Sequence, residues 1–210
     1  MLQKRQYVGR NQMTINIEPI HLERSNFAGL LSGVSVANGI SKEDATKIED
    51  GMNHFSVLVL RDQKITDDQQ YAFSEHFGQM EQATGDPDQS ATRRLSMNVN
   101  DISNLDENGG VMAIDDRRAL FSLGNRLWHS DSSFKQTPAK FSLLSARRIP
   151  ASGGNTQFAD MRAAWDALAP EIQAECMGRI CLMPFINYIR LIVGFMRVRG
   201  TRLTTGFNSP

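Results

Sequence analysis

The sequence predicts an α+β fold, and three observations lead to this prediction. Short strand-like runs occur at 14–20, 55–60 and 138–146, and the first two contain the β-branched residues typical of strands. Helix-start signals stand between these runs, at Ser41 and Thr66. A chain of 210 residues is long enough for one domain with a sizeable core. We therefore expect strands flanked by helices.

The N-terminal half is predicted to alternate between the two kinds of element. Spaced isoleucines predict a first strand within residues 14–20, and glycines punctuate a connection over residues 29–39. Ser41 and the acidic residues after it predict a helix that runs to about residue 52. Thr66 and Gln69 have the spacing of a capping box, which opens a second helix that a glycine at position 78 ends.

Charge is distributed unevenly along the chain. All 23 acidic residues lie at or before Glu175, so the first 175 residues hold 23 acidic and 18 basic residues, whereas the last 35 hold five arginines and no acid. Globular sequences rarely segregate charge so sharply. The break in charge separates an atypical basic tail (179–210) from a domain (14–178). Residues 1–13 are polar and without periodicity, so we predict a disordered extension there.

Two interpretations of the tail stay open. Our main hypothesis is that it is out-of-frame sequence, which would make the chain a truncated gene product. In the alternative, residues 187–197 form a helix whose asparagine and arginines share one polar face, as in an anchor at a membrane surface.

The overall composition narrows the classes of partner and compartment. A formal net charge of zero favours neither nucleic acid nor an anionic membrane as partner. Two cysteines do not make a disulfide framework, and no apolar segment follows the basic residues near the N-terminus as it would in a signal peptide. We expect a reduced, cytoplasmic protein, and the sequence leaves a homo-oligomer open.

The centre of the chain carries a pattern of metal-ligand type. His129 and Asp131 are separated by one residue, so in extended backbone their side chains point to the same side. Imidazole and carboxylate together suit Fe(II), and a second histidine would complete a 2-His-1-carboxylate triad with open positions. An isolated pair of this kind occurs often by chance. The alternative is therefore a surface histidine beside a solvated aspartate.

Further patterns follow the metal pair. Gly153 and Gly154 give the backbone freedom just before Thr156, which suits a turn that brings a hydroxyl close to a ligand. Asp160 is placed to cap a short helix, and Pro170 suits the first residue of another.

Three motifs in this order resemble the TauD/TfdA family of Fe(II)- and 2-oxoglutarate-dependent dioxygenases. They are Trp-His-Ser-Asp-Ser-Ser-Phe at 128–134, Phe-Ser-Leu-Leu-Ser-Ala at 141–146 and Gly-Gly-Asn-Thr-Gln-Phe-Ala-Asp-Met-Arg-Ala-Ala at 153–164. The match is closest to the 2,4-dichlorophenoxyacetate dioxygenase branch, and it fades after about residue 176.

This resemblance implies a fold, a site and a reaction. The fold is mainly β, a cupin-like double-stranded β-helix, or jelly roll, with flanking helices, and would be incomplete in this chain. His129 and Asp131 correspond to two iron ligands, Thr156 to a residue that helps to hold the far carboxylate of 2-oxoglutarate, and Asn125 to a position near substrate. The implied reaction uses dioxygen to hydroxylate a small aryloxyacetate-like acid, with release of succinate and CO2.

Part of the expected site has no counterpart in the sequence. No histidine occurs after Asp131, so the second histidine ligand and the arginine that pairs with 2-oxoglutarate have no matching position. We therefore leave the activity of this chain open. The alternatives are a dioxygenase of taurine or another alkylsulfonate, and an inactive remnant or non-catalytic jelly-roll binding module.

Overall fold

The computed structural model describes residues 14–81, 95, 99–116, 118–119, 123–133 and 135–179. The chain divides into two compact units, one formed by residues 1–80 with 143–173 and the other by 81–142 with 174–210. The predicted extension at 1–13, and the predicted tail apart from its first residue, lie outside the described residues. Their predicted character stays a prediction.

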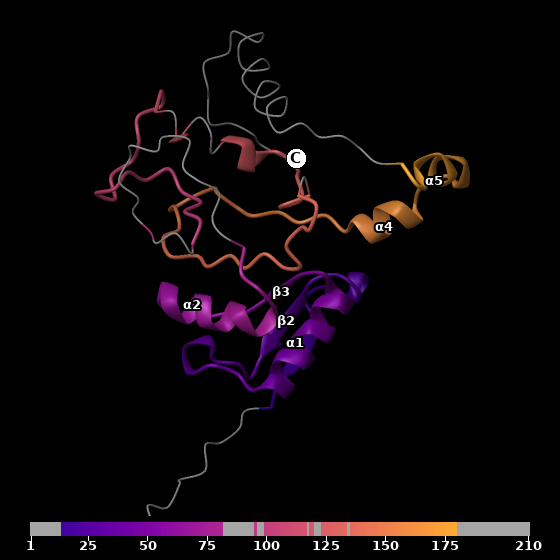
Figure 1. Cartoon of the computed structure of the whole chain (residues 1–210), viewed down its shortest axis with the longest axis horizontal. Coiled ribbons are helices and arrows are strands. Elements are labelled where there is room, and N and C mark those ends of the chain that lie inside the picture. Colours follow the sequence, from indigo (N-terminus) through magenta and orange to yellow (C-terminus); the bar gives the residue numbers. More distant parts are fainter. Residues whose placement is uncertain are drawn as a thin grey trace, which may run out of the picture. The chain divides into compact units, whose positions relative to one another are not determined.

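The helices and strands of the described residues are coloured along the chain in Figure 1. The first unit contains β1 (Asn16–Pro19), η1 (Leu22–Arg24), β2 (Gly29–Ser32), η2 (Val36–Asn38), α1 (Lys42–Phe55), β3 (Leu58–Val59), α2 (Asp67–Ser74), η3 (Glu75–Phe77) and α4 (Met161–Asp166), where η marks a 3-10 helix. The second unit contains η4 (Leu123–Arg126), and α5 (Pro170–Cys176) crosses the boundary between the units.

The first unit contains a mixed three-stranded sheet in the order β1-β2-β3. β1 runs antiparallel to β2, and β2 runs parallel to β3. The first predicted strand is confirmed. The strand predicted at 55–60 forms only at Leu58–Val59, because Phe55 is the last residue of α1 and Ser56 then turns the chain with a φ of 61°. β2 lies where we expected only a connection. The glycines at both ends of its short apolar run had indicated a connection there.

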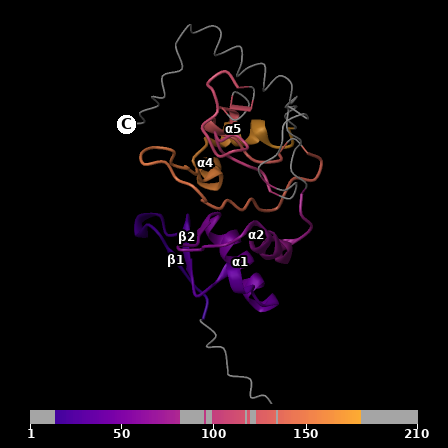
Figure 2. The same ribbon diagram turned by 90° about the vertical axis from the view of Figure 1, so that its left-hand side faces the viewer.

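Both predicted helix starts are confirmed. Ser41 caps α1 by accepting a 3.0 Å hydrogen bond from the amide of Asp44. Thr66 and Gln69 form the complete capping box at the start of α2, with each side chain bonded to the other residue's amide. Figures 1 and 2 both show α1 and α2 alongside the sheet. At each helix start a side chain therefore accepts from an amide that has no partner inside the helix.

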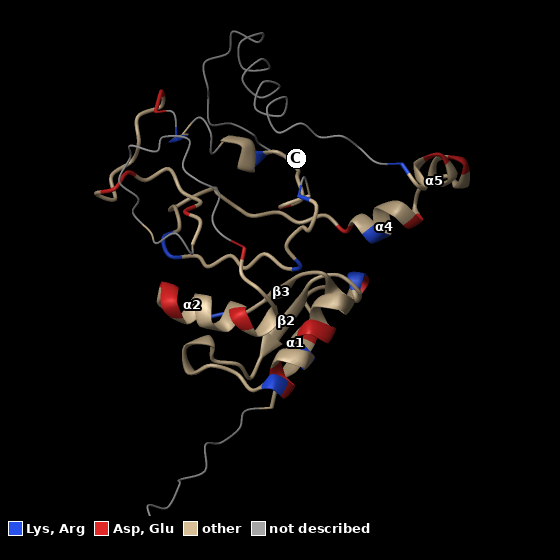
Figure 3. Cartoon of the chain, in the orientation of Figure 1, with Lys and Arg blue, Asp and Glu red and all other residues tan. Residues whose placement is uncertain are grey.

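The buried core of the first unit lies between the sheet and these two helices. Its centre is a cluster of Leu31, Val36, Ile48 and Phe73. Every buried residue of the described ranges falls between positions 29 and 74. The outer face of α1 is different, because acidic and basic residues are interspersed along it (Figure 3). α1 is thus an amphipathic helix with a solvated, mixed-charge outer face.

The strand expected at 138–146 is not formed. Residues 141–146 have no ladder partner among the described residues, and side chains of α2 hold the segment instead. Gln70 donates a 3.1 Å hydrogen bond to the carbonyl of Leu143, and Arg147 donates 3.0 Å bonds to Asp67 and to Gln70. A strand needs a neighbouring strand to satisfy its backbone, and no strand of the described ranges lies beside this segment. The described residues therefore have an α+β structure, and the jelly roll stays a proposal.

Arg162 ties the start of α4 to the end of α1 within the first unit. Its guanidinium donates to the carbonyls of Asn53 at 3.0 Å, of His54 at 3.1 Å and of Asn26 at 3.1 Å. The last carbonyls of a helix lack partners inside it and lie at the negative end of its dipole. One cation therefore satisfies two carbonyls that α1 leaves free, and also the carbonyl of Asn26. Asp160 caps α4 as predicted, by accepting from the amides of residues 162 and 163.

No helix of the described residues combines the length and the apolar character that crossing a bilayer requires.

Candidate metal centre

The second unit brings the side chains of His129 and Asp131 together. The Nε2 atom of His129 lies 3.3 Å from Oδ1 of Asp131. His129 follows η4 closely, and Asp131 opens a turn over residues 131–133, so the pair lies between a 3-10 helix and a turn and belongs to no strand. The two side chains are 35% and 58% exposed. A ligand can therefore reach both.

The hydrogen bonding of His129 determines which ring nitrogen is free to bind a cation. Its Nδ1 atom lies 2.6 Å from the carbonyl oxygen of Leu127. A carbonyl oxygen only accepts, so Nδ1 carries the proton, and the neutral ring keeps its lone pair on Nε2. That lone pair faces a carboxylate oxygen. Two acceptors this close need a metal cation or a second proton between them.

The two oxygens of the Asp131 carboxylate have different partners. Oδ1 faces His129, whereas Oδ2 accepts a 2.7 Å hydrogen bond from the hydroxyl of Ser142. Metal-binding carboxylates and histidines usually hold such outer hydrogen bonds, which orient the ligand atoms. The pair therefore fits a divalent metal as two of its protein ligands.

The turn after Asp131 is strained and is held from its other side. Ser132 has a φ of 55°, in the left-handed region that side chains other than glycine disfavour. Its hydroxyl donates a 2.7 Å bond to Glu81, and the Lys135 ammonium also bonds Glu81. The bond from Lys135, followed by that from Ser132, holds the pKa of the Glu81 carboxyl below its ordinary value. Glu81 is therefore an anionic anchor for this turn.

The other two residues singled out from the sequence lie in different units. Asn125 is exposed on η4, in the same unit as the metal pair. Thr156 is exposed in the first unit, in the segment that leads to α4. Gly153 and Gly154 before it both have a φ of 72°, so the turn predicted there is present. The ligand-binding roles of Asn125 and Thr156 stay predictions.

Sequence patterns did not single out Ser142 or Glu81. Their hydrogen-bond partners are 11 and 51 residues away, so no local spacing marks the contacts. Only the position of Ser142 inside the second of the three motifs could have drawn attention to it.

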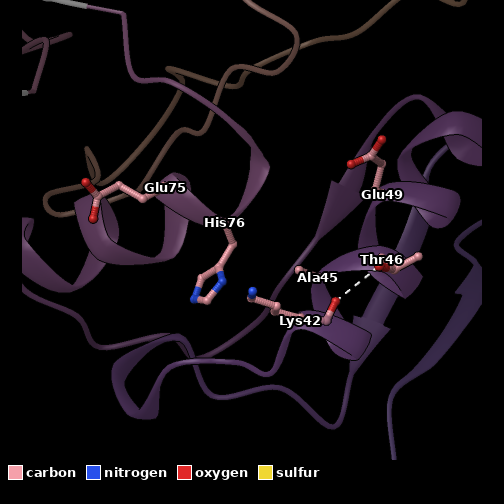
Figure 4. Close-up of a pocket in the computed structure, with 6 residues that line it drawn as sticks. All are labelled: Lys42, Ala45, Thr46, Glu49, Glu75 and His76. Carbon is pink, nitrogen blue, oxygen red and sulfur yellow. Dashed lines mark hydrogen bonds between the residues drawn. The ribbon is translucent and has the colours of Figure 1, made fainter.

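His76 lines a separate hollow in the first unit, together with Lys42, Ala45, Thr46, Glu49 and Glu75, with a volume of about 350 Å³. Figure 4 shows the end of the Lys42 side chain beside the His76 ring, while both glutamates point away from that ring. A neighbouring ammonium opposes the binding of a metal cation.

Across the described residues, no group of three or more His, Cys, Asp or Glu side chains is arranged to hold a metal ion. The pair of His129 and Asp131 is therefore a partial centre.

Comparison with known proteins gives a family match over most of the chain. Residues 20–183 match the family described as "Taurine catabolism dioxygenase TauD, TfdA family". An alpha-ketoglutarate-dependent 2,4-dichlorophenoxyacetate dioxygenase of Burkholderia sp. (strain RASC) is 39% identical over 166 residues, which are 79% of this chain and 55% of that protein. The enzyme of the same description from Cupriavidus pinatubonensis is also 39% identical, over 79% of this chain and 57% of its own length.

A solved structure supports the same relationship. The crystal structure of AAD-2 in complex with Mn(II) and N-oxalylglycine is 47% identical in sequence, with a TM-score of 0.66. The match covers 78% of this chain and 53% of that one. The chain thus spans about half the length of the relatives that it matches.

Proposed function

The chain belongs to the TauD/TfdA family of dioxygenases, and from this premise we propose that it acts in the Fe(II)- and 2-oxoglutarate-dependent hydroxylation of a small aryloxyalkanoic acid. One observation carries the proposal. The Nε2 atom of His129 lies 3.3 Å from a carboxylate oxygen of Asp131 in a chain 39% identical to two 2,4-dichlorophenoxyacetate dioxygenases.

The proposed roles follow from the chemistry of each side chain. His129 and Asp131 hold Fe(II), which with 2-oxoglutarate supplies the activation of dioxygen for hydroxylation of a substrate C–H bond. Thr156 matches the family residue that helps to hold the far carboxylate of 2-oxoglutarate, and we assign it that role. Asn125 lies near the substrate. That AAD-2 binds Mn(II) supports a divalent metal at the pair.

The product follows from where the hydroxyl is added. Hydroxylation at the carbon next to the ether oxygen of an aryloxyacetate gives a hemiacetal, and its collapse releases a phenol and a 2-oxo acid. A sulfonate such as taurine would instead lose sulfite from its hydroxylated carbon. The two substrate classes are therefore distinguished by their products.

The complete site needs donors beyond those of the described residues. No third His, Cys, Asp or Glu side chain joins His129 and Asp131 as a metal ligand among the described residues. The fold that we propose around the site is the double-stranded β-helix, and the compartment is the cytoplasm. Assembly as a homo-oligomer would be one way to cover the exposed site.

Turnover of the full chain tests the proposal. Succinate formation is measured in air with Fe(II), ascorbate and 2-oxoglutarate, against a set of aryloxyacetates and a set of alkylsulfonates. We expect succinate and phenol in equal amounts from an aryloxyacetate, none with Asp131→Ala, and unchanged turnover with His76→Gln, a histidine outside the pair. Succinate without phenol, or sulfite from a sulfonate, would replace the aryloxyalkanoate assignment. Absence of any turnover would contradict a catalytic role for this chain.

A further inference from the structure

The Asp131 carboxylate is oriented although it is exposed. Its side chain is 58% exposed, so packing does not fix its rotamer. The contact with Ser142 does so instead, because the hydroxyl donates to Oδ2 at 2.7 Å and thereby leaves Oδ1 facing His129. A hydrogen bond from a hydroxyl to a charged carboxylate is short and about twice as strong as a neutral one.

The two carboxylate oxygens of Asp131 have different roles in metal binding. A carboxylate that binds a metal through one oxygen keeps its other oxygen for an outer hydrogen bond. With Oδ2 held by Ser142, the carboxylate presents a single oxygen next to the free nitrogen of His129. Without that bond, the exposed carboxylate can rotate, and binding must then order it at an entropic cost.

The backbone at Asp131 is held independently of Ser142. The left-handed Ser132 bonds Glu81 through its hydroxyl, and its carbonyl accepts a 2.9 Å bond from the amide of Lys135. A backbone strain of this kind persists only where the surroundings determine it, and it occurs most often at functional sites. The turn thus fixes the backbone position of Asp131, whereas the hydrogen bond from Ser142 determines the orientation of its carboxylate.

We propose that Ser142 is a positioning residue that orients Asp131 for metal binding through Oδ1. This inference rests on the proposed function in one respect only, which is that His129 and Asp131 bind a divalent metal. It assigns no contact between Ser142 and the metal or the substrate.

Binding of Co(II) alone to the full chain tests the inference, because it gives both an affinity and a ligand-field absorption spectrum without turnover. We expect Ser142→Ala to weaken Co(II) binding by about tenfold, at the lower end of the effect of outer hydrogen-bond partners, and to change the absorption bands. Ser142→Thr keeps the hydroxyl and should restore both. Ser145→Ala removes a hydroxyl from the same segment and is the matched control, with wild-type affinity and spectrum expected.

The outcomes separate this inference from the metal centre itself. If the wild type binds no Co(II), the metal pair fails and the positioning role fails with it. If the wild type binds Co(II) but Ser142→Ala matches it in affinity and spectrum, the positioning role alone is overturned. A loss that Ser142→Thr does not restore, or that Ser145→Ala shares, would mean a general effect on the segment and would also overturn it.

Discussion

At the scale of single residues, Glu81 combines a charge and a geometric role. Its carboxylate accepts from the Ser132 hydroxyl and pairs with the Lys135 ammonium, and so bridges the strained turn beside the metal pair. Both partners favour the charged form of the carboxyl, and both therefore lower its pKa in the folded chain. The strength of the anchor must consequently depend on pH.

We predict that the stabilisation from Glu81 disappears in acid. A carboxyl whose pKa is lowered by folding contributes its full stabilisation above the unfolded-state value of about 4.3, and that stabilisation is lost as the pH falls through the lower folded-state pKa. Carbon-13 NMR of the side-chain carboxyl should therefore titrate below about 4.3. Glu81→Gln should remove this titration and the corresponding pH dependence of stability. A midpoint at or above the ordinary value would contradict the bridge.

At the scale of secondary-structure elements, Arg162 joins α4 to the end of α1. Arg162 and His54, whose carbonyl it bonds, are 108 positions apart in the sequence. Its planar guanidinium donates to several carbonyls at once, which the single ammonium of a lysine does with poorer geometry. The side chain therefore stabilises a contact between elements as well as the end of one helix.

We predict that Arg162→Ala lowers the free energy of unfolding by about 1 kcal/mol, because three exposed carbonyls lose hydrogen bonds from a charged donor. Arg162→Lys should recover part of the loss. Arg61→Ala, at an exposed arginine of the same unit, is the control and should stay within about 0.5 kcal/mol of wild type. Denaturant unfolding followed by circular dichroism measures all three. An Arg162→Ala variant as stable as the control would show that these bonds contribute nothing net.

The same scale explains which elements could be predicted from the sequence. Helix starts depend on neighbouring residues, so Ser41, Thr66 and Asp160 were predicted from short patterns and are confirmed. Strands depend on partners distant in sequence. The apolar run at 141–146 was predicted to be a strand but has no partner strand among the described residues. The apolar run of β2 is too short to stand out in the sequence, and it forms a strand because β1 and β3 pair with it on either side.

The candidate site shows the same division. The spacing of His129 and Asp131 marked them as a pair, and the structure does bring their side chains together. The contacts that orient them, from Ser142 and through Glu81, involve separate segments and leave no local pattern. Whether Thr156 and Asn125 bind ligands stays a prediction.

At the scale of the whole molecule, burial is concentrated in one part of the chain. Every buried residue of the described ranges lies between positions 29 and 74. No described apolar side chain after residue 99 is buried, and Trp128 and Ile149 are 70% and 81% exposed. Exposed apolar groups and few buried contacts favour local opening.

We predict a matching contrast in amide hydrogen exchange. Amides of α1 and β2 should exchange slowly, through opening of the core, whereas amides of residues 99–116 and 123–133 should exchange orders of magnitude faster. Mass spectrometry of the full chain resolves the two classes by peptide. Equal protection in both would contradict the uneven burial. Added Co(II) should slow exchange in peptides that contain residues 127–133, since binding stabilises the state that it selects.

Anaerobic titration of the full chain with Fe(II) in the presence of 2-oxoglutarate tests the central claim most directly, which is that His129 and Asp131 bind one metal together. The claim predicts a metal-to-ligand charge-transfer band that saturates with Fe(II), is lost in His129→Gln and in Asp131→Asn, and is kept in His76→Gln. Absence of the band in the wild-type chain, or its persistence in His129→Gln or in Asp131→Asn, would contradict the claim that the two residues bind one metal.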